Sequence, residues 1–345
     1  MIALLIAGTV AFLTAIIGTP FLIGWLQAHG IGQPIREDGP SGHITKAGTP
    51  TMGGIAIVAG TMFGYLVAHL REGTIFTRGG ILVALAIAGA GAVGGVDDWI
   101  KVRNARNLGL NKRAKIGGLL IVAVAFGVLA IEWANVSTAL SFTRYDSIGI
   151  ELAPWLFVVW AVLLFLATSN GANLTDGLDG LAAGSSILSW GAYTVIAFWA
   201  FRHPEVYRVP QALDLALVGA AMVGALAGFL WWNAPPARIF MGDTGSLAIG
   251  AGLAAMALVT STHLLLPIIV GLFVIETLSV ITQVASFRLF GRRLYRMAPI
   301  HHHFELGGWP EPTVIVRFWI LAGLSTAVAV GIYYADYLSI PGAID

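Results

Sequence analysis

The 345-residue sequence contains no cysteine, and only 11% of its residues are charged. The absence of cysteine excludes disulfide bonds, thiolate nucleophiles and zinc sites with cysteine ligands. Soluble domains carry about 25% charged residues, so the charge content is too low for a water-soluble enzyme of this size. The formal net charge is +1. No overall field attracts nucleic acid, and we expect no nucleic-acid partner.

Hydrophobic residues and glycine are abundant instead, with 57% of the chain hydrophobic and 43 glycines. A glycine share well above about 7% suits helices that pack closely in lipid. Because a spanning helix needs roughly 20 apolar residues, we predict a single all-α integral membrane domain over residues 1–345 with ten transmembrane helices. The spans are expected near 2–26, 53–70, 79–96, 117–134, 153–169, 181–201, 213–232, 247–262, 264–287 and 314–334.

The distribution of basic residues predicts the orientation of these spans. Fourteen of the 19 Lys and Arg residues fall in or beside odd-numbered loops, and the other five fall in even-numbered loops. The positive-inside rule therefore places the odd-numbered loops in the cytoplasm and both termini outside. Residues 1–28 contain no Lys or Arg, so the basic region of a cleaved signal peptide is missing and we expect the first segment to remain as a span.

Acidic residues near lipid are costly, so their positions are informative. Five aspartates lie at predicted cytoplasmic helix ends, and these are Asp97, Asp98, Asp176, Asp179 and Asp243. The orientation was assigned from Lys and Arg alone, which makes the shared side of the aspartates independent evidence for a site. In a chain without cysteine, clustered carboxylates favour a hard cation, and we expect Mg²⁺, which binds one or two carboxylates together with water and phosphate oxygens.

Two simpler interpretations of these aspartates stay open. Asp243 precedes Thr244-Gly245-Ser246 and can be a helix cap that accepts free backbone N–H groups. Asp97 and Asp98 can be interfacial residues paired with Lys101, which lies one helical turn after Asp97.

The predicted ninth loop supplies cationic groups for an anionic substrate. It contains Arg288, Arg292, Arg293 and Arg296, followed by His301, His302 and His303. Arginine beside imidazole suits the positioning of a phosphoryl group, although a basic patch on an anionic membrane surface is the alternative. A glycine-rich turn after Lys46 adds weaker evidence for phosphate binding. Together these features predict a cytoplasmic cleft that transfers a phosphoryl-linked group from a soluble nucleotide to a lipid.

Five motifs in order carry a family resemblance. They are Gly39-Pro40 with His43, Lys46 and 48–54; Asp97-Asp98 with Lys101; 173–180; Asn233 with 240–246; and 299–305. Through nearly its whole length the sequence resembles the phospho-N-acetylmuramoyl-pentapeptide-transferase family. Its aspartate pattern is similar to that of the wider polyprenyl-phosphate sugar-1-phosphate transferase superfamily.

The resemblance implies a reaction, a cofactor and a location. Undecaprenyl phosphate would attack UDP-N-acetylmuramoyl-pentapeptide, giving lipid I and UMP for peptidoglycan synthesis. The resemblance also implies Mg²⁺ dependence, a homodimer, and a multi-pass protein of the bacterial inner membrane with a cytoplasmic active site.

The resemblance also implies roles for individual residues. The catalytic set is Asp97, Asp98, Asp243, His301, His302 and His303, with the three aspartates at the metal. The substrate-binding set is Lys46, Thr51, Lys101, Lys115, Asn173, Asp176, Gly177, Asp179, Asn233 and Phe240. Asp98 matches a candidate base, but a phosphate monoester is already largely anionic at pH 7. We therefore assign Asp97 and Asp98 to metal and substrate positioning, and we assign no role to Glu276.

Two alternatives to this function differ in class. A sister transferase would use UDP-N-acetylglucosamine or another UDP-sugar with the same acceptor. A transporter would place ionisable residues near the bilayer midplane on broken helices. The helix-end positions of all but one of the notable acids disfavour the transporter.

Overall fold

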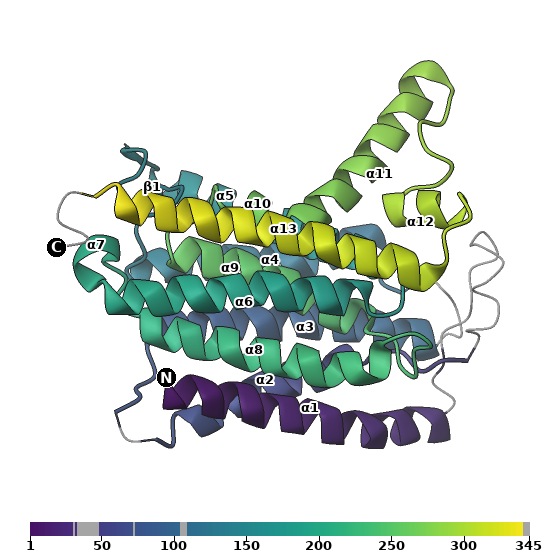
Figure 1. Cartoon of the computed structure of the whole chain (residues 1–345), viewed down its shortest axis with the longest axis horizontal. Coiled ribbons are helices and arrows are strands. Elements are labelled where there is room, and N and C mark those ends of the chain that lie inside the picture. The colour runs from purple at the N-terminus through teal and green to yellow at the C-terminus, as the bar shows by residue number, and fades with distance from the viewer. Residues whose placement is uncertain (30–31, 33–47, 72, 104–108, 341–345) are drawn as a thin grey trace.

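A computed structural model describes residues 1–29, 32, 48–71, 73–103 and 109–340, and long helices that run side by side dominate it (Figure 1). In this described part of the chain, nine helices are long and apolar enough to cross a membrane. They are α1 (Ile2–Ala28), α3 (Arg78–Arg103), α4 (Lys112–Glu132), α5 (Pro154–Thr175), α6 (Leu181–Arg202), α8 (Ala212–Asn233), α9 (Gly242–Val259), α11 (Gly271–Phe290) and α13 (Glu311–Leu338). The prediction of an all-α integral membrane protein is confirmed.

Shorter elements connect the long helices. They are α2 (Gly54–Ala68), α7 (Pro204–Tyr207), α10 (Leu266–Ile269), α12 (Ile300–Glu305) and an antiparallel hairpin of β1 (Ala139–Leu140) and β2 (Ile150–Glu151). The apolar helix α2 has 15 residues, which gives a length of about 22 Å against a hydrocarbon core of about 30 Å. A helix covers most of each of the ten expected spans, but α2 alone falls short of spanning length.

The expected ninth span, 264–287, is wrong as a single helix. The chain forms α10, leaves the helical conformation at Val270 (φ −97°, ψ 33°) and resumes as α11. The break changes the direction of the chain, so α11 diverges from the bundle and projects away from it (Figure 1). The expected span is therefore divided into a short helix, of which Leu266 and Ile269 are buried, and a longer one with few buried residues.

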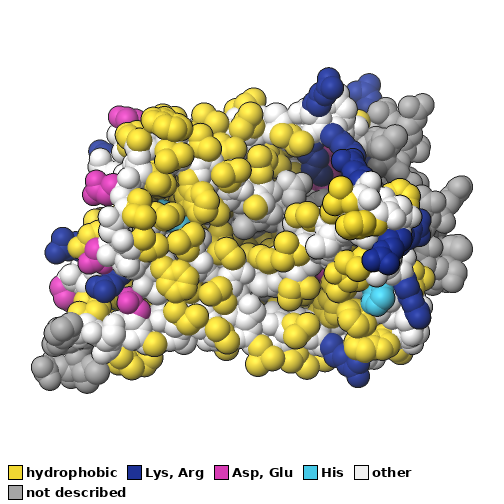
Figure 2. Space-filling view, turned by 90° about the horizontal axis from the view of Figure 1, so that it is seen from above, with side chains coloured by type: hydrophobic (Ala, Val, Ile, Leu, Met, Phe, Trp, Pro, Cys, Tyr) yellow, Lys and Arg dark blue, Asp and Glu magenta, His cyan; other side chains and the backbone are white. Residues whose placement is uncertain are grey.

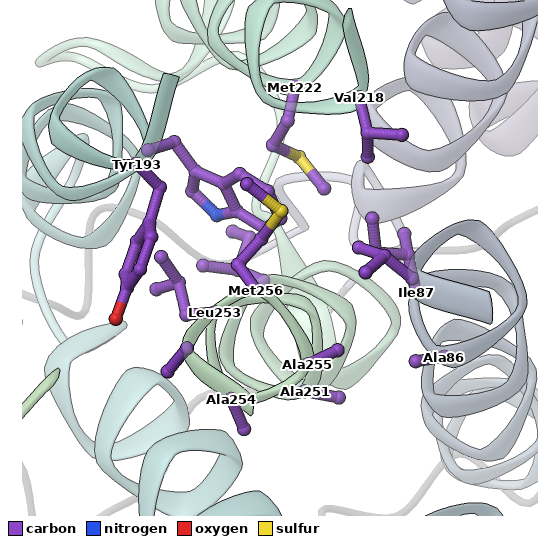
Figure 3. Packing of buried hydrophobic residues seen from close by; sticks show 14 of the residues in the cluster. Ala86, Ile87, Tyr193, Val218, Met222, Ala251, Leu253, Ala254, Ala255 and Met256 are labelled. Atoms are coloured by element: carbon purple, nitrogen blue, oxygen red, sulfur yellow. The ribbon is translucent and has the colours of Figure 1, made fainter. Parts of the chain in front are cut away.

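The helix α9 forms the centre of the bundle. All of its residues except Gly242 are buried, and small side chains such as Ala251 and Ala255 lie on the side that faces Ala86 and Ile87 of α3 (Figure 3). Gly94 of α3 permits a close approach, because a Cβ there would collide with the Asp243 carbonyl of α9. This packing brings the end of α3 against the beginning of α9.

The two ends of the bundle differ in charge. The first residues of α1 and the last residues of α13 lie at the same end, whereas α1 and α3 finish at the other (Figure 1). On the face drawn in Figure 2, Lys and Arg side chains gather at the end where α1 and α3 finish, and most of the visible Asp and Glu lie at the opposite end. The aspartates at the end of α3 therefore belong to the more basic end.

Candidate active site

Three aspartates meet where α3 ends and α9 begins. Asp97 and Asp98 lie in the last two turns of α3, and Asp243 lies in the first turn of α9. Each offers one carboxylate oxygen within 4.8 Å of the others. All three residues are at most 7% exposed. Because the contact between α3 and α9 joins them, this carboxylate cluster is a product of the tertiary fold.

Two lysines face the carboxylate cluster. Lys101 Nζ lies 2.6 Å from Asp97 Oδ2 and 2.7 Å from Asp243 Oδ2. Lys115 Nζ, from the first turn of α4, lies 2.6 Å from the same Asp243 oxygen. The expected placement of Lys101 on the face of Asp97 is confirmed. These ammonium groups offset the repulsion among three buried carboxylates.

Asp98 is used as a cap for α9. Its Oδ1 accepts the Asp243 N–H at 3.1 Å, and its Oδ2 accepts the Thr244 N–H at 2.9 Å and the Thr244 hydroxyl at 2.7 Å. The first N–H groups of a helix have no partner within the helix. Asp98 therefore supplies from α3 the cap that α9 lacks, and it fixes the backbone that carries Asp243.

The end of α5 closes another side of the cluster. Asn173 donates from Nδ2 to Asp243 Oδ1 and to the Ser246 hydroxyl. Asp176 follows the helix and accepts the Gly242 N–H, while burial and then the neighbouring Asp243 and Asp98 carboxylates raise the pKa of Asp176 to about 8. The structure thus brings both residues of this motif to the beginning of α9.

Asp179 and Asn233 stabilise the adjoining loops. Asp179 Oδ2 accepts the Ala237 N–H at 3.0 Å. Asn233 Oδ1 accepts the Gly180 N–H at 3.1 Å, and its Nδ2 donates to the Ile239 carbonyl at 2.9 Å. These contacts hold the α5–α6 turn against the chain that follows α8, so both residues fix the backbone of the adjoining loops.

The first loop packs against the segment that leads into α9. The Phe240 N–H donates to the Pro50 carbonyl at 2.8 Å, and the Phe240 carbonyl accepts the Gly53 N–H at 2.9 Å. Thr51 is buried beside Gly242. Lys46 lies outside the described residues. The described part of the glycine-rich segment, residues 48–53, therefore joins the site before α2 begins.

The three histidines occupy α12 and have different surroundings. His301 is fully buried and its Nδ1 lies 3.0 Å from Glu276 Oε1. His302 Nδ1 lies 2.6 Å from Glu305 Oε2. His303 Nδ1 accepts the Arg296 N–H at 3.1 Å. Of the three, His301 directly joins another site motif, because its Nε2 faces Gly177.

Among the described residues, the arginines of the ninth loop form no ion pair with the carboxylate cluster. Arg288, Arg292 and Arg293 are exposed at the projecting end of α11. Arg296 donates from Nη1 to the Leu306 carbonyl and so holds the loop after α12. The Arg296 contact is structural, whereas the other three arginines are exposed.

Sequence reasoning missed several residues that support the site. Glu276 pairs with His301, Glu311 Oε1 accepts the Asp179 N–H at 3.1 Å, and the Leu110 N–H donates to Asp97 Oδ1 at 2.7 Å. Only Glu276 gave a signal in the sequence, as an acid in the middle of an apolar span. The others became recognisable only once the helices were placed.

The described residues offer one set of acidic or histidine side chains with ligand atoms close enough for a metal ion, namely the carboxylate cluster. One oxygen from each of the three carboxylates lies within 4.8 Å of the other two, so the three side chains share one candidate cation position. All-oxygen donors of this kind fit Mg²⁺.

Comparisons with family models and with individual proteins agree on one family. The model for glycosyl transferase family 4 matches residues 80–261, and signature 1 of phospho-N-acetylmuramoyl-pentapeptide-transferase matches residues 46–58. Proteins with that transferase name are 51% identical in Frankia alni, over 98% of this chain and 99% of the relative, and 50% identical in Thermobifida fusca, over the same shares. The Mycobacterium leprae relative is 48% identical over 99% of both chains.

Proposed function

Because the chain belongs to the phospho-N-acetylmuramoyl-pentapeptide-transferase family, we propose that it makes lipid I and UMP from undecaprenyl phosphate and UDP-N-acetylmuramoyl-pentapeptide. The observation that carries this proposal is the meeting of Asp97, Asp98 and Asp243 with two lysines at the helix ends. Relatives of full length and about half-identical sequence bear this transferase name, which favours it over the sister reaction with UDP-N-acetylglucosamine.

The reaction is an exchange of phosphoryl bonds. An oxygen of the lipid phosphate forms a bond to the β-phosphorus of the donor, the bond from that phosphorus to the bridging oxygen breaks, and UMP leaves with that oxygen. The lipid phosphate is already largely anionic at pH 7, so little deprotonation is required. Positioning and charge neutralisation are therefore the main tasks of the protein.

We propose Mg²⁺ as the cofactor of the carboxylate cluster. Asp97 and Asp243 would hold the ion, while Asp98, whose oxygens accept N–H groups of α9, orients Asp243. Mg²⁺ held there would supply neutralisation of the diphosphate charge. Lys101 and Lys115 would contact phosphate oxygens in place of Asp243, and His301, His302 and His303 would lie beside the donor.

The nucleoside end of the donor is assigned to the loops that the other motifs hold. Asn173 and Asp176 contact the beginning of α9, Phe240 lies two residues before it, and Gly177 follows Asp176 in the same turn. We propose that uridine binds there, with Asp179 and Asn233 fixing the loop backbone. Thr51 and Lys46 belong to the first loop and are assigned to the donor on the family motif.

We further propose ten spans, with α2 and its flanking residues as the tenth, and a site on the cytoplasmic side of the inner membrane. The basic end of the molecule supports this orientation (Figure 2). We also propose a homodimer, on the family resemblance alone. Native mass spectrometry of the detergent-solubilised protein tests it, and a monomer at micromolar concentration would contradict it.

UMP release by purified protein tests the proposed activity. With Mg²⁺ and undecaprenyl phosphate, we expect release from the muramoyl-pentapeptide donor and none from UDP-N-acetylglucosamine. Asp243→Ala should lose the activity, whereas Asp146→Ala, at an exposed acid of the opposite end, should keep it. Release from UDP-N-acetylglucosamine alone would move the protein to the sister reaction.

A further inference from the structure

Glu276 is a buried acid in the middle of a helix that is otherwise largely exposed. Its side chain is 0% exposed, although exposed apolar residues such as Ile275 and Leu278 flank it in α11. An isolated carboxylate in such surroundings is costly, so the burial calls for specific partners. These partners come from α12, which lies beside α11 (Figure 1).

The two oxygens of Glu276 are used differently. Oε2 accepts the N–H of Ile300, the first residue of α12, at 3.0 Å. Oε1 lies 3.0 Å from His301 Nδ1. One carboxylate therefore accepts a hydrogen bond from the beginning of α12 and also makes a close contact, without hydrogen-bond geometry, to the ring of its first histidine.

The other side of the His301 ring faces the donor-binding motif. His301 Nε2 is buried and has no hydrogen-bond partner among the described residues. A Cβ added at Gly177 would collide with that nitrogen, so glycine is needed for the approach. Gly177 lies between Asp176 and Asp179, and the ring thus bridges α11 and the turn after α5.

We propose that Glu276 is a positioning residue, which holds His301 with Nδ1 toward the carboxylate and Nε2 toward the Gly177 turn and the substrate beyond it. A carboxylate at one ring nitrogen fixes the ring orientation and determines which nitrogen carries the proton. His301 then presents a defined Nε2 to the donor. This inference rests on the proposed function, because the substrate is the UDP donor of that reaction.

Glu276→Gln tests the inference with little change in shape. Glutamine keeps the side-chain volume and an oxygen for the Ile300 N–H, but it removes the negative charge beside His301. We expect kcat to fall about tenfold to a hundredfold, by analogy with the loss of a carboxylate partner from a metal-bound histidine. KM for both substrates should stay within about twofold and the Tm close to wild type. Glu151→Gln, at an exposed acid of the hairpin, is the matched control.

A double-mutant cycle separates positioning from a general structural role. If Glu276 acts through His301, adding Glu276→Gln to His301→Gln costs no further activity. With an active wild type, two outcomes would overturn the inference. One is a double variant whose loss of kcat is the product of the two single losses. The other is a loss of activity in Glu276→Gln that equals its unfolded fraction. A wild type that releases no UMP would overturn the proposed function and, with it, this inference.

Discussion

Asp98, which the family resemblance places in the catalytic set, uses both carboxylate oxygens to accept hydrogen bonds from the first turn of α9. The carboxylate accepts two N–H groups and one hydroxyl from the first turn of α9. A base that accepts a proton from the lipid phosphate needs an available carboxylate oxygen, and three donors already occupy the two oxygens of Asp98. The geometry favours a positioning role for Asp98, in agreement with the argument that the lipid phosphate is already ionised.

Replacing Asp98 with Ala should therefore destabilise the protein as well as inactivate it. Leaving buried donors of α9 unpaired costs about 1–3 kcal/mol, and we expect a lower Tm in detergent micelles. Asp98→Asn, which retains one oxygen, should lie between Ala and wild type. An unchanged Tm in Asp98→Ala with lost turnover would show that the role of Asp98 is purely chemical.

Lys101 provides a direct test of the metal site. Its ammonium group contacts Asp97 and Asp243, so Lys101→Met leaves the clustered carboxylates with less compensation. We expect a lower Tm without Mg²⁺ and a larger rise in Tm on adding millimolar Mg²⁺ than in the wild type. Arg103→Met, at an exposed residue of the same helix end, is the control. A Tm independent of Mg²⁺ in every variant would contradict the metal assignment.

At the scale of elements, the opposite end of the bundle has its own polar anchor. Asp214, in the first turn of α8, accepts the Thr77 N–H and hydroxyl and the Tyr65 hydroxyl. Its other oxygen lies 3.0 Å from His69 Nε2. These contacts join α2, α3 and α8 where the apolar packing ends, and they make Asp214 a structural acid.

Asp214→Ala should separate stability from activity. The change leaves the half-buried Thr77 donors and the buried Tyr65 hydroxyl without their acceptor, which costs about 1–3 kcal/mol, so we expect a clear fall in Tm. Asp214 stands 19 residues before Asn233 in α8, a rise of about 28 Å from the site end. UMP release per folded molecule should therefore match wild type. A fall in UMP release per folded molecule that accompanies the fall in Tm would contradict a purely structural role of Asp214.

The hydrophobic runs predicted where helices lie but not how they end. Length and apolarity suffice for α6 or α8, whose bounds lie within one residue of the expected spans. The break before α11 was missed because Val270 carries no breaker signal and Pro267 lies in the first turn of α10, where proline is tolerated. Tertiary packing, which the runs do not encode, decides that geometry.

The sequence predicts the residues of the site, whereas the contacts between them are seen only in the folded structure. The motifs identified Asp97, Asp243 and Lys101, whose contact joins segments more than 140 positions apart. No local pattern indicates that Asp98 caps α9 or that Glu276 holds His301. Such contacts depend on how the helices are placed in space. The sequence by itself therefore indicates which side chains belong to the site but not which residues they contact.

At the scale of the whole molecule, cysteine labelling tests the proposed orientation. The chain has no cysteine, so single cysteines report on exposure without interference. Arg113→Cys lies at the site end and Glu205→Cys at the opposite end, and both positions are exposed. In intact cells, a membrane-impermeant maleimide should label only Glu205→Cys. After permeabilisation both should react, and labelling of Arg113→Cys in intact cells would reverse the orientation.

The most direct test of the central claim is the identity of the lipid product. Protein in vesicles with undecaprenyl phosphate, Mg²⁺ and UDP-N-acetylmuramoyl-pentapeptide should form a lipid whose mass equals both reactants less UMP. Asp243→Asn, made in equal amount and folded, should form none. An unchanged lipid phosphate in the wild-type sample, or full product from Asp243→Asn, would contradict the transfer of the phospho-muramoyl group at this carboxylate cluster.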